Sequence, residues 1–405
     1  MSNVQESYDY VIVGGGVAAA SAVKGIRSED GDGSIAVLGS EPAKPVYRPD
    51  LSKDLWLKDE ATLAGSSLAG DLDDDEHVDL LTDTTVTEVD PAAHVVRLAD
   101  RSSVGYGKLL LATGAEPRTL AIDPGPRVVY YRTAGDYERL RAVAAAGSHV
   151  AVVGGGYIGT EITSALVQND VQVTLVLDLE DVQEQMFPRA LAASLTKAFA
   201  DRGVTIVHGS VLSGEETDGG VRIRLDDGTD IAADAAVVGV GVLPRTGLAE
   251  AAGLEVDNGV VVDDHLRTSA DDVYAAGDVA SYPDALLGRR RVEHVDHAEK
   301  SGGHAGKVMA GADAAYDYTP FFWSDILDAG YEAIGETSSR LDMVEDWKDG
   351  AIGTGVVYYL ASGQVRGVLL WNVWDSVDKA RELIAETAKQ PVADPETLRG
   401  RIPLG

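Results

Sequence analysis

The chain has 405 residues, of which 45% are hydrophobic, so it is too long for one ordinary core and two or three domains are expected. Its 66 acidic side chains outnumber 34 basic ones and give a formal net charge of −32. A surface this negative repels nucleic acid and anionic lipid, so neither is expected as a partner. The absence of cysteine excludes disulfides, thiolate metal sites, iron–sulfur ligation and a catalytic dithiol, and no metal site is expected.

Hydropathy and charge also bear on where the chain works. Apolar stretches such as residues 235–242 are far shorter than the ~20 residues that span a bilayer, so a soluble protein without membrane insertion is expected. The first predicted strand begins near Tyr8, which leaves no room for a signal or transit peptide and favours a cytoplasmic location. The excess negative charge destabilises a compact chain unless salt screens it. A halophilic, high-salt cytoplasm is therefore the hypothesis, and an ordinary acidic bacterial protein is the alternative.

An apolar strand, a run of glycines and an alanine-rich helix open the chain over residues 10–27. Gly14 permits the tight turn after the strand, and Gly16 lets a pyrophosphate approach the backbone. The helix N-terminus can then hold phosphate charge through its free N–H groups and its dipole, while Ala19 is small enough for helix and strand to pack closely. The spacing predicts a dinucleotide site, with Glu41, just past the next strand, accepting hydrogen bonds from the adenosine ribose.

The same order of strand, glycine turn, helix and strand recurs at residues 149–177. Two copies indicate an internal duplication at domain scale rather than a solenoid. The turn residues expected to hold the second nucleotide are Gly154, Gly156, Tyr157, Ile158 and Gly159. Asp178 follows the last strand and is the predicted ribose ligand. Its carboxylate would repel a 2′-phosphate, and no arginine or lysine follows until Arg189, so NADH is favoured and NADPH is left open.

The pattern along the chain predicts three domains of the α/β class. Two are Rossmann-like domains with three layers of the ββα type, and the third is a C-terminal α+β domain of aromatic-rich short strands with a closing helix over residues 376–389. The predicted boundaries are residues 1–118 with 245–320 for the first domain, 119–244 for the second and 321–405 for the third.

Further motifs carry a resemblance to a known family. They are Arg-Pro-Asp-Leu-Ser-Lys at 48–53, Ala-Thr-Gly at 112–114 with Pro-Arg at 117–118, Thr-Ser at 268–269, Val-Tyr-Ala-Ala-Gly-Asp at 273–278, Val-Glu-His at 292–294, Phe-Trp-Ser-Asp at 322–325 and Gly-Tyr-Glu-Ala-Ile-Gly at 330–335. Together with the two glycine turns, the whole chain resembles the FAD-dependent pyridine nucleotide reductases of the ferredoxin reductase and apoptosis-inducing factor branch. The last two motifs are closer to the apoptosis-inducing factor side.

The resemblance implies FAD in the first domain and a nicotinamide nucleotide in the second. Asp278 would bind a ribityl hydroxyl, with a turn-forming aspartate as the alternative, Val86 would present its backbone to the adenine, and Gly241 would leave space for the nicotinamide. The other residues implied at the FAD are Arg48, Lys53, Ala112, Thr113, Gly114, Arg118, Gly277, Val279, His294 and Trp323. For His294 and Trp323 a structural role has nearly equal weight.

The same resemblance singles out Lys53 and Glu161 as the catalytic pair. The Lys53 ammonium would lie near the flavin ring and bond Glu161, where a fixed cation stabilises negative charge on the flavin. In the alternative, Lys53 is a surface residue and Glu161 only complements a helix dipole.

The implied activity is an FAD-dependent NAD(P)H oxidoreductase that passes hydride from NADH to FAD and electrons on to a small redox protein, such as a ferredoxin or rubredoxin. Related disulfide and peroxide reductases need a redox-active cysteine, so their chemistry is excluded. Quinone and oxygen are weaker candidates for the acceptor. The alternative function is that of an apoptosis-inducing factor-like, NADH-sensing flavoprotein with slow oxidase or diaphorase activity and a regulatory or scaffold role. A homodimer is left open.

Overall fold

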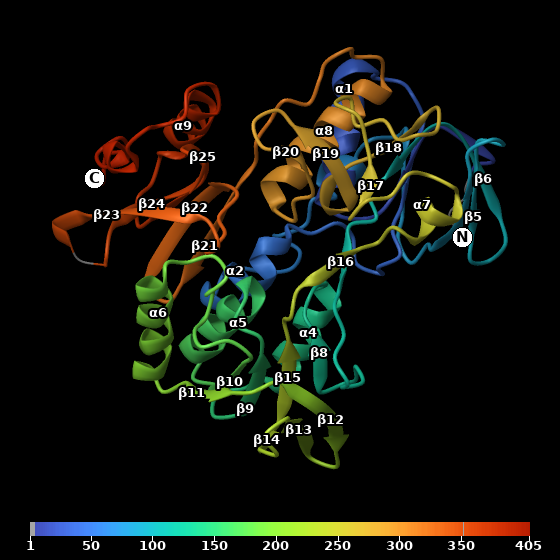
Figure 1. Cartoon of the computed structure of the whole chain (residues 1–405). Coiled ribbons are helices and arrows are strands. Elements are labelled where there is room, and N and C mark those ends of the chain that lie inside the picture. The colour runs from blue at the N-terminus through green and yellow to red at the C-terminus, as the bar shows by residue number, and fades with distance from the viewer. Residues whose placement is uncertain (1–4, 351) are drawn as a thin grey trace. The chain divides into compact units, whose positions relative to one another are not determined.

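The computed structural model in Figure 1 describes residues 5–350 and 352–405. The chain divides into two compact units. Met1–Arg48, Thr62–Glu116 and Leu243–Pro320 make up unit 1, and Pro49–Ala61, Pro117–Val242 and Phe321–Gly405 make up unit 2. The predicted division into three domains stays a prediction.

Unit 1 is built on a seven-stranded sheet in which parallel strands lie beside an antiparallel meander. Its central strand β1 (Ser7–Val13) pairs in parallel with β2 (Ile35–Leu38) on one side and with β6 (Ser103–Leu111) on the other. The remaining strands are β3 (Val78–Leu81) beyond β2, β18 (Val273–Ala275) beside β6, and the meander of β5 (Val95–Leu98) and β4 (Val86–Asp90). All four residues of β2 are buried, as expected of a parallel strand covered on both faces.

Helix α1 (Val17–Glu29), which connects β1 to β2, packs closely against α8 (Val295–Met309), as Figure 1 shows. A Cβ atom built on Gly302 would lie 2.3 Å from the carbonyl oxygen of Ala18, and one on Gly306 would lie 2.1 Å from that of Ala22. Only glycine permits this approach of two backbones. Since Ser301 of α8 accepts a hydrogen bond from Gly277 N–H at 2.9 Å, the helix pair also holds the turn that carries Asp278.

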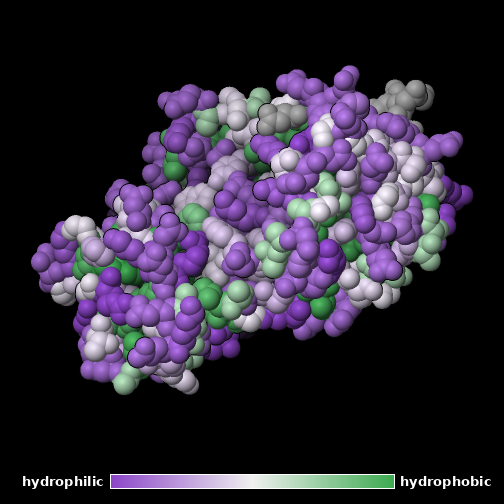
Figure 2. Space-filling model, turned by 90° about the horizontal axis from the view of Figure 1, so that it is seen from above, coloured by the Kyte–Doolittle hydropathy of each residue, from purple (hydrophilic) through white to green (hydrophobic). Residues whose placement is uncertain are grey.

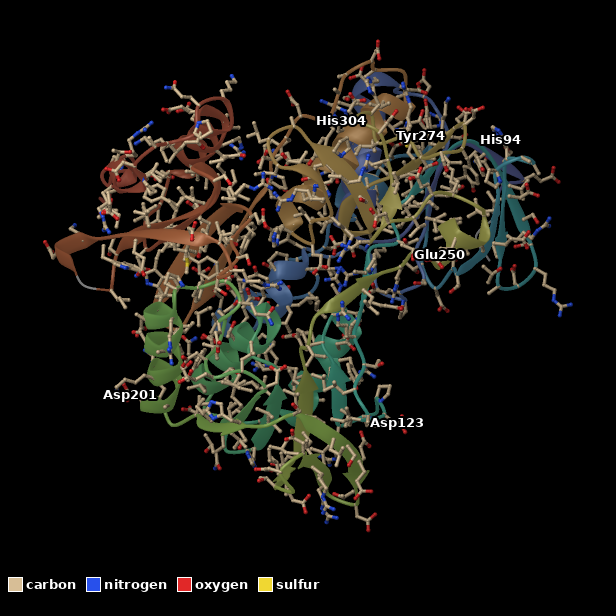
Figure 3. The ribbon with its side chains drawn as sticks, in the orientation of Figure 1. His94, Asp123, Asp201, Glu250, Tyr274 and His304 are labelled. Carbon is tan, nitrogen blue, oxygen red and sulfur yellow. The ribbon has the colours of Figure 1, made fainter. Side chains whose placement is uncertain are left out.

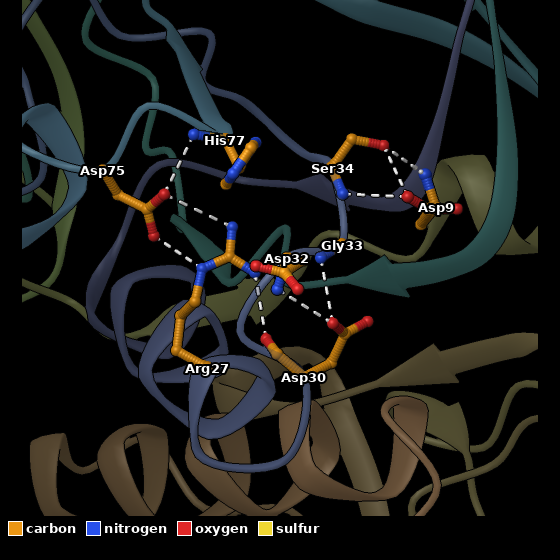
Figure 4. Close-up of polar contacts among 8 residues, drawn as sticks. All are labelled: Asp9, Arg27, Asp30, Asp32, Gly33, Ser34, Asp75 and His77. Carbon is orange, nitrogen blue, oxygen red and sulfur yellow. Dashed lines mark hydrogen bonds and ion pairs between the residues drawn. The ribbon is translucent and has the colours of Figure 1, made fainter.

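The chain between α1 and β2 is fixed by polar side chains (Figure 4). The Asp30 carboxylate accepts hydrogen bonds from Gly33 N–H at 2.9 Å and from the Tyr10 hydroxyl at 2.9 Å, and the Gly33 bond is the main cause of its lowered pKa. Arg27 bonds Asp75 from Nε at 2.5 Å. These contacts hold the end of α1 beside the sheet and so fix where the following strand begins.

The other elements of unit 1 are small. They are α3 (Gly70–Asp73), α7 (Gly247–Ala251), the 3₁₀ turn η2 (Gly277–Val279) and the strands β17 (Val260–Val261), β19 (Ala280–Asp284) and β20 (Gly288–Arg290). The chain passes between the units in β7 (Ala115–Pro117) and β16 (Val242–Pro244), and η1 (Arg48–Ser52) spans the first boundary.

Unit 2 contains the second predicted nucleotide-binding fold. Its parallel sheet has the order β11 (Thr205–His208), β10 (Gln172–Leu177), β9 (His149–Val153), β15 (Ala235–Val238) and β8 (Val128–Tyr130). The helices are α2 (Asp54–Leu57), α4 (Ala134–Val143), α5 (Tyr157–Gln168) and α6 (Arg189–Asp201). An antiparallel sheet of β12 (Val211–Thr217), β13 (Gly220–Leu225) and β14 (Asp230–Ala233) shares one hydrophobic cluster with the parallel sheet, for example through Ile223 and Val153. This arrangement gives the predicted three layers.

The C-terminal segment forms a five-stranded antiparallel sheet within unit 2. Its order is β21 (Phe321–Ile326), β22 (Ala329–Gly335), β25 (Gln364–Trp371), β24 (Gly355–Ala361) and β23 (Asp342–Trp347). The short turn η3 (Lys348–Gly350) lies between β23 and β24, and α9 (Val377–Lys389) and the turn η4 (Pro395–Leu398) follow the sheet. Trp371 of β25 is buried. Trp374 lies in a loop with positive φ at Asn372 and Asp375, where its side chain is 49% exposed and its ring covers Gly330 of β22.

The predicted α/β fold class is confirmed. No helix within residues 5–350 and 352–405 combines the length and the apolar character that a membrane crossing requires.

Candidate functional site

The first glycine turn leaves the start of α1 open. Gly14 has φ +136° and a Cβ there would meet the Ala112 carbonyl oxygen at 2.1 Å, so the turn requires glycine. A Cβ on Gly16 would meet nothing within 4 Å, and no side chain caps the helix at this residue. The N–H groups of the first turn of α1 have no helical partner, so they can bind an anion in that open space. Ala19 is fully buried, as the predicted contact between helix and strand requires.

The second turn repeats this geometry in unit 2. Gly154 has φ +107°, and a Cβ there would meet the Gly239 carbonyl oxygen at 2.5 Å. Gly156 has open space around it and no side-chain cap, as Gly16 has. A Cβ on Gly159 would lie 1.8 Å from the Gly154 carbonyl oxygen, so this position does not accept the alanine found at 19. Each turn therefore fits a pyrophosphate, and the two together fit two dinucleotides. Tyr157, at the start of α5, is 40% exposed, and Ile158 beside it is partly buried.

The predicted ribose ligands lie in different surroundings. Glu41 is partly buried and its Oε1 accepts a hydrogen bond from Arg48 Nη2 at 2.6 Å, so two residues predicted at the FAD form an ion pair. Asp178 is exposed just after β10. The first following arginine, Arg189, is 82% exposed in its side chain and pairs with Glu180 at 3.1 Å.

The other residues predicted at the FAD fall into two groups. In unit 1, the Thr113 hydroxyl donates to the Arg245 carbonyl at 2.9 Å, and Gly114, with φ +68°, has open space around its Cα. Val86, Ala112, Gly277 and Val279 are buried there, whereas Asp278 and His294 are partly buried. In unit 2, Arg118 is exposed and donates from its backbone N–H to the Gly241 carbonyl at 2.9 Å. Trp323, also in unit 2, is partly buried on β21.

His294 lies just before the first turn of α8. Burial, with a smaller contribution from Arg290, lowers the pKa of its imidazole to about 3. The ring is therefore neutral at ordinary pH. His297, one turn along the helix, is fully buried, and its ring stacks on Tyr282 with centroids 4.6 Å apart.

The predicted catalytic pair is an ion pair inside unit 2. Lys53 Nζ lies 2.6 Å from Glu161 Oε1, and the two side chains are only 11% and 7% exposed. Lys53 is therefore no surface residue, and Glu161 does more than face a helix dipole. A role at the flavin stays a prediction.

The segment that carries Lys53 is held by unit 2 through contacts on both sides of the lysine. The Tyr131 hydroxyl donates to the Leu51 carbonyl, and the Tyr137 hydroxyl donates to the Leu55 carbonyl at 3.1 Å. Asn169 Nδ2, at the end of α5, donates to the Trp56 carbonyl at 3.0 Å. The helix that carries Glu161 thus also anchors the segment that carries its partner.

Two serines also bond this pair, and no role was predicted for either of them. The Ser52 hydroxyl donates to Glu161 Oε2 at 2.5 Å, and the Ser324 hydroxyl donates to Glu161 Oε1 at 2.6 Å. Both lie inside motifs that carry the family resemblance, directly beside Lys53 and Trp323. Position within those motifs was the only available signal, because nothing in the sequence indicates that residues 52, 161 and 324 meet.

Comparison with known proteins agrees with this geometry. Residues 8–302 match the family described as pyridine nucleotide-disulphide oxidoreductase. The chain is 35% identical to the anthranilate 1,2-dioxygenase system ferredoxin–NAD(+) reductase component of Burkholderia cepacia, over 95% of this chain and 97% of that protein. It is 34% identical to the mitochondrial apoptosis-inducing factor 1 of Dictyostelium discoideum, over 94% of this chain and 78% of that protein.

The fold is also similar to that of solved structures. The covalent putidaredoxin reductase–putidaredoxin complex matches with a TM-score of 0.86 and 28% identity, covering 98% of this chain and 96% of that chain. Residues, fold and relatives agree, and the chain belongs to the pyridine nucleotide-disulphide oxidoreductase family as a member without cysteine.

Proposed function

We propose that the chain is an FAD-dependent NAD(P)H oxidoreductase of the ferredoxin reductase type, which takes electrons from NADH and delivers them to a small redox protein. The observation that carries this proposal is the pair of open glycine turns, at Gly16 in unit 1 and at Gly156 in unit 2. Each leaves the N-terminus of a helix accessible to a pyrophosphate. A chain with two such sites binds two dinucleotides, as hydride transfer between them requires.

FAD, when bound, supplies the chemistry by accepting a hydride and releasing its electrons one at a time. The protein holds the cofactors and adjusts the charge around them. Glu41 and Arg48 would hold the adenosine end of FAD, Asp278 its ribityl chain, and Asp178 the adenosine ribose of NADH. The Lys53 ammonium, fixed by Glu161, would stabilise the negative charge that the flavin gains.

The preference for NADH rests on the acidic surroundings of Asp178. Asp178, Glu180 and Asp181 follow β10 within four residues, and a 2′-phosphate there would meet repulsion from each carboxylate. Arg189 offers little compensation because Glu180 already pairs with it.

A small iron–sulfur protein such as a ferredoxin or a rubredoxin is the proposed acceptor. The ferredoxin–NAD(+) reductase component and the putidaredoxin reductase among the relatives support this class. The absence of cysteine supports it too, because a disulfide or peroxide acceptor would need a thiol on this chain. A homodimer stays a prediction.

The test is anaerobic titration of the FAD-loaded protein with NADH and NADPH, followed by steady-state NADH oxidation with and without purified carriers. We expect NADH to bleach the flavin rapidly and a ferredoxin or rubredoxin to raise turnover at least about tenfold. Protein that binds no FAD when it is offered in excess would refute the function outright. Slow turnover with every carrier, together with a change of mass on reduction in sedimentation, would instead favour an NADH-sensing role like that proposed for an apoptosis-inducing factor-like protein.

We further propose a cytoplasm of high salt concentration as the place of action. The formal charge of −32 supports this, and Figure 2 shows hydrophilic residues over most of the face that it displays. Asp123, Asp201 and Glu250, labelled in Figure 3, are among the exposed carboxylates. Molar KCl should screen the repulsion among these carboxylates and raise the unfolding temperature of the protein. Equal stability in dilute buffer and in molar KCl would refute the proposal of a high-salt cytoplasm.

A further inference from the structure

The Glu161 carboxylate on α5 accepts three hydrogen bonds from segments far apart in the sequence. Its Oε1 bonds Lys53 Nζ at 2.6 Å and the Ser324 hydroxyl at 2.6 Å, and its Oε2 bonds the Ser52 hydroxyl at 2.5 Å. All four residues belong to unit 2. The carboxylate therefore joins the segment around Lys53 to strand β21.

These contacts are almost completely removed from water. Ser324 is 1% exposed, Ser52 4% and Glu161 6%. An ionised carboxylate has only acceptor sites, and Lys53, Ser52 and Ser324 each offer it a donor. Hydrogen bonds to a charged group are strong when they are buried. If one donor is removed, water cannot reach the carboxylate to replace the lost bond.

The two serines act on different parts of the carboxylate. Ser52 holds Oε2 and so fixes the rotation of the carboxylate plane, while Ser324 shares Oε1 with the lysine. If either hydroxyl is lost, the carboxylate can rotate, and its negative charge interacts more strongly with the Lys53 ammonium. Lys53 would then be drawn toward Glu161, and less of its positive charge would act on anything beyond the pair.

We propose that Ser52 and Ser324 are positioning residues that set the place and the effective charge of the Lys53 ammonium, and through it the reduction potential of the bound flavin. They act through Lys53 and need not touch the cofactor. Because Ser324 directly follows Trp323 on β21, the same bond also fixes the start of the C-terminal sheet with respect to the pair. The inference rests on the proposed function only in requiring that FAD binds near Lys53.

A double-mutant cycle tests whether the serines act through Lys53. The quantity measured is the midpoint potential of the FAD-loaded protein, obtained by equilibration with reference dyes, so the readout does not depend on turnover. Ser52→Ala and Ser324→Ala should each weaken stabilisation of the two-electron-reduced state about tenfold, which lowers the midpoint potential by about 30 mV. In the Lys53→Met background neither change should lower the potential further, because the cation through which both serines act is gone.

Ser164→Ala is the matched control. Ser164 is 2% exposed on the same helix, and its hydroxyl accepts a hydrogen bond from Leu327 N–H at 2.8 Å, but it does not bond Glu161. It should leave the potential unchanged. Thermal unfolding of each apoprotein separates a loss of stability from a loss of positioning. If one serine variant fails to fold, the potential of the other variant is enough to test the inference.

The inference is refuted if both serine variants keep the wild-type potential, or if they shift it equally with and without Lys53. Failure of the proposed function looks different, because the FAD-loaded protein would then reduce no carrier although its potential still responded to the two serine substitutions.

Discussion

Arg48 Nη2 donates to Glu41 Oε1 at 2.6 Å, so the residue predicted to hold the adenosine ribose is itself held by another residue predicted at the FAD. The two side chains are 26% and 27% exposed. One carboxylate oxygen of Glu41 is thus engaged by the arginine, and the other can accept hydrogen bonds from a ribose. The ion pair orients Glu41 before the cofactor arrives.

Arg48→Met should therefore weaken FAD binding more than it weakens the fold. Without the arginine, Glu41 rotates freely and must be ordered when FAD binds, so we expect the dissociation constant to rise roughly tenfold. The stability of the apoprotein should fall by less than about 1 kcal/mol, because the pair is partly exposed. FAD titration and urea unfolding measure the two effects. Lys44→Met, which removes an exposed pair with Asp73, is the control and should change neither.

The glycines of the first turn should separate cofactor binding from folding. Gly16 has φ −109° and open space around it, so Gly16→Val should keep the apoprotein folded and abolish FAD binding by filling the space expected for the pyrophosphate. Gly14→Ala should instead destabilise the fold by several kcal/mol, because φ is +136° and the new methyl group would meet the Ala112 carbonyl oxygen. Thermal unfolding of the apoproteins and retention of yellow colour distinguish the two. A Gly16→Val protein that purifies with stoichiometric FAD would contradict the assignment of this turn.

Asp178→Ser should reduce the preference for NADH over NADPH without removing it. The change deletes one carboxylate that repels a 2′-phosphate, but Glu180 and Asp181 stay in place. We expect the ratio of kcat/KM for the two nucleotides to fall about tenfold, mainly through a lower KM for NADPH. Asp201→Ser, at the end of α6 in the same unit, removes an equal charge and should leave the ratio unchanged. An unaltered ratio for Asp178→Ser would show that the ribose is held elsewhere.

The sequence was most informative where backbone geometry leaves little choice. Glycine at 14 and at 154 is required by positive φ and by a close carbonyl, and this requirement is local enough to appear as a motif. β9 begins at His149 and β10 ends at Leu177, which are the bounds predicted for the repeated pattern, and α9 begins one residue after the predicted position. Local patterns of this kind do not depend on how distant segments meet.

Contacts between distant segments could not be predicted from the sequence. Ser324 lies 163 residues from Glu161, and only the folded unit brings the hydroxyl to the carboxylate. Trp374 is a similar case, because the sequence does not show that its half-exposed ring meets Gly330, which lies 44 residues earlier on β22. The family resemblance identified Lys53 and Glu161 as a pair, but it said nothing about the donors that surround them.

His297 should make stability depend on pH in the mildly acidic range. The side chain is fully buried beside Tyr282 and Tyr316, and burial lowers the pKa of its imidazole from 6.5 to about 4, with a smaller opposing contribution from Asp278. Between these two values the unfolded chain binds a proton that the folded chain does not, so stability is present above the unfolded pKa and is lost as the pH falls through this window. From about pH 7.5 to about pH 5.5 the loss due to this residue is about 1.4 kcal/mol.

The measurement is urea unfolding of the wild type and of His297→Gln at both pH values in the same salt. Glutamine does not titrate, so the variant should lose about 1.4 kcal/mol less than the wild type over this range, whatever its stability at the higher pH. The exposed His77 supplies the control, and His77→Gln should behave as the wild type does. Parallel losses in all three proteins would mean that His297 takes up its proton in the folded state, and the buried ring would then have to be reached by water or stabilised as a cation by Asp278.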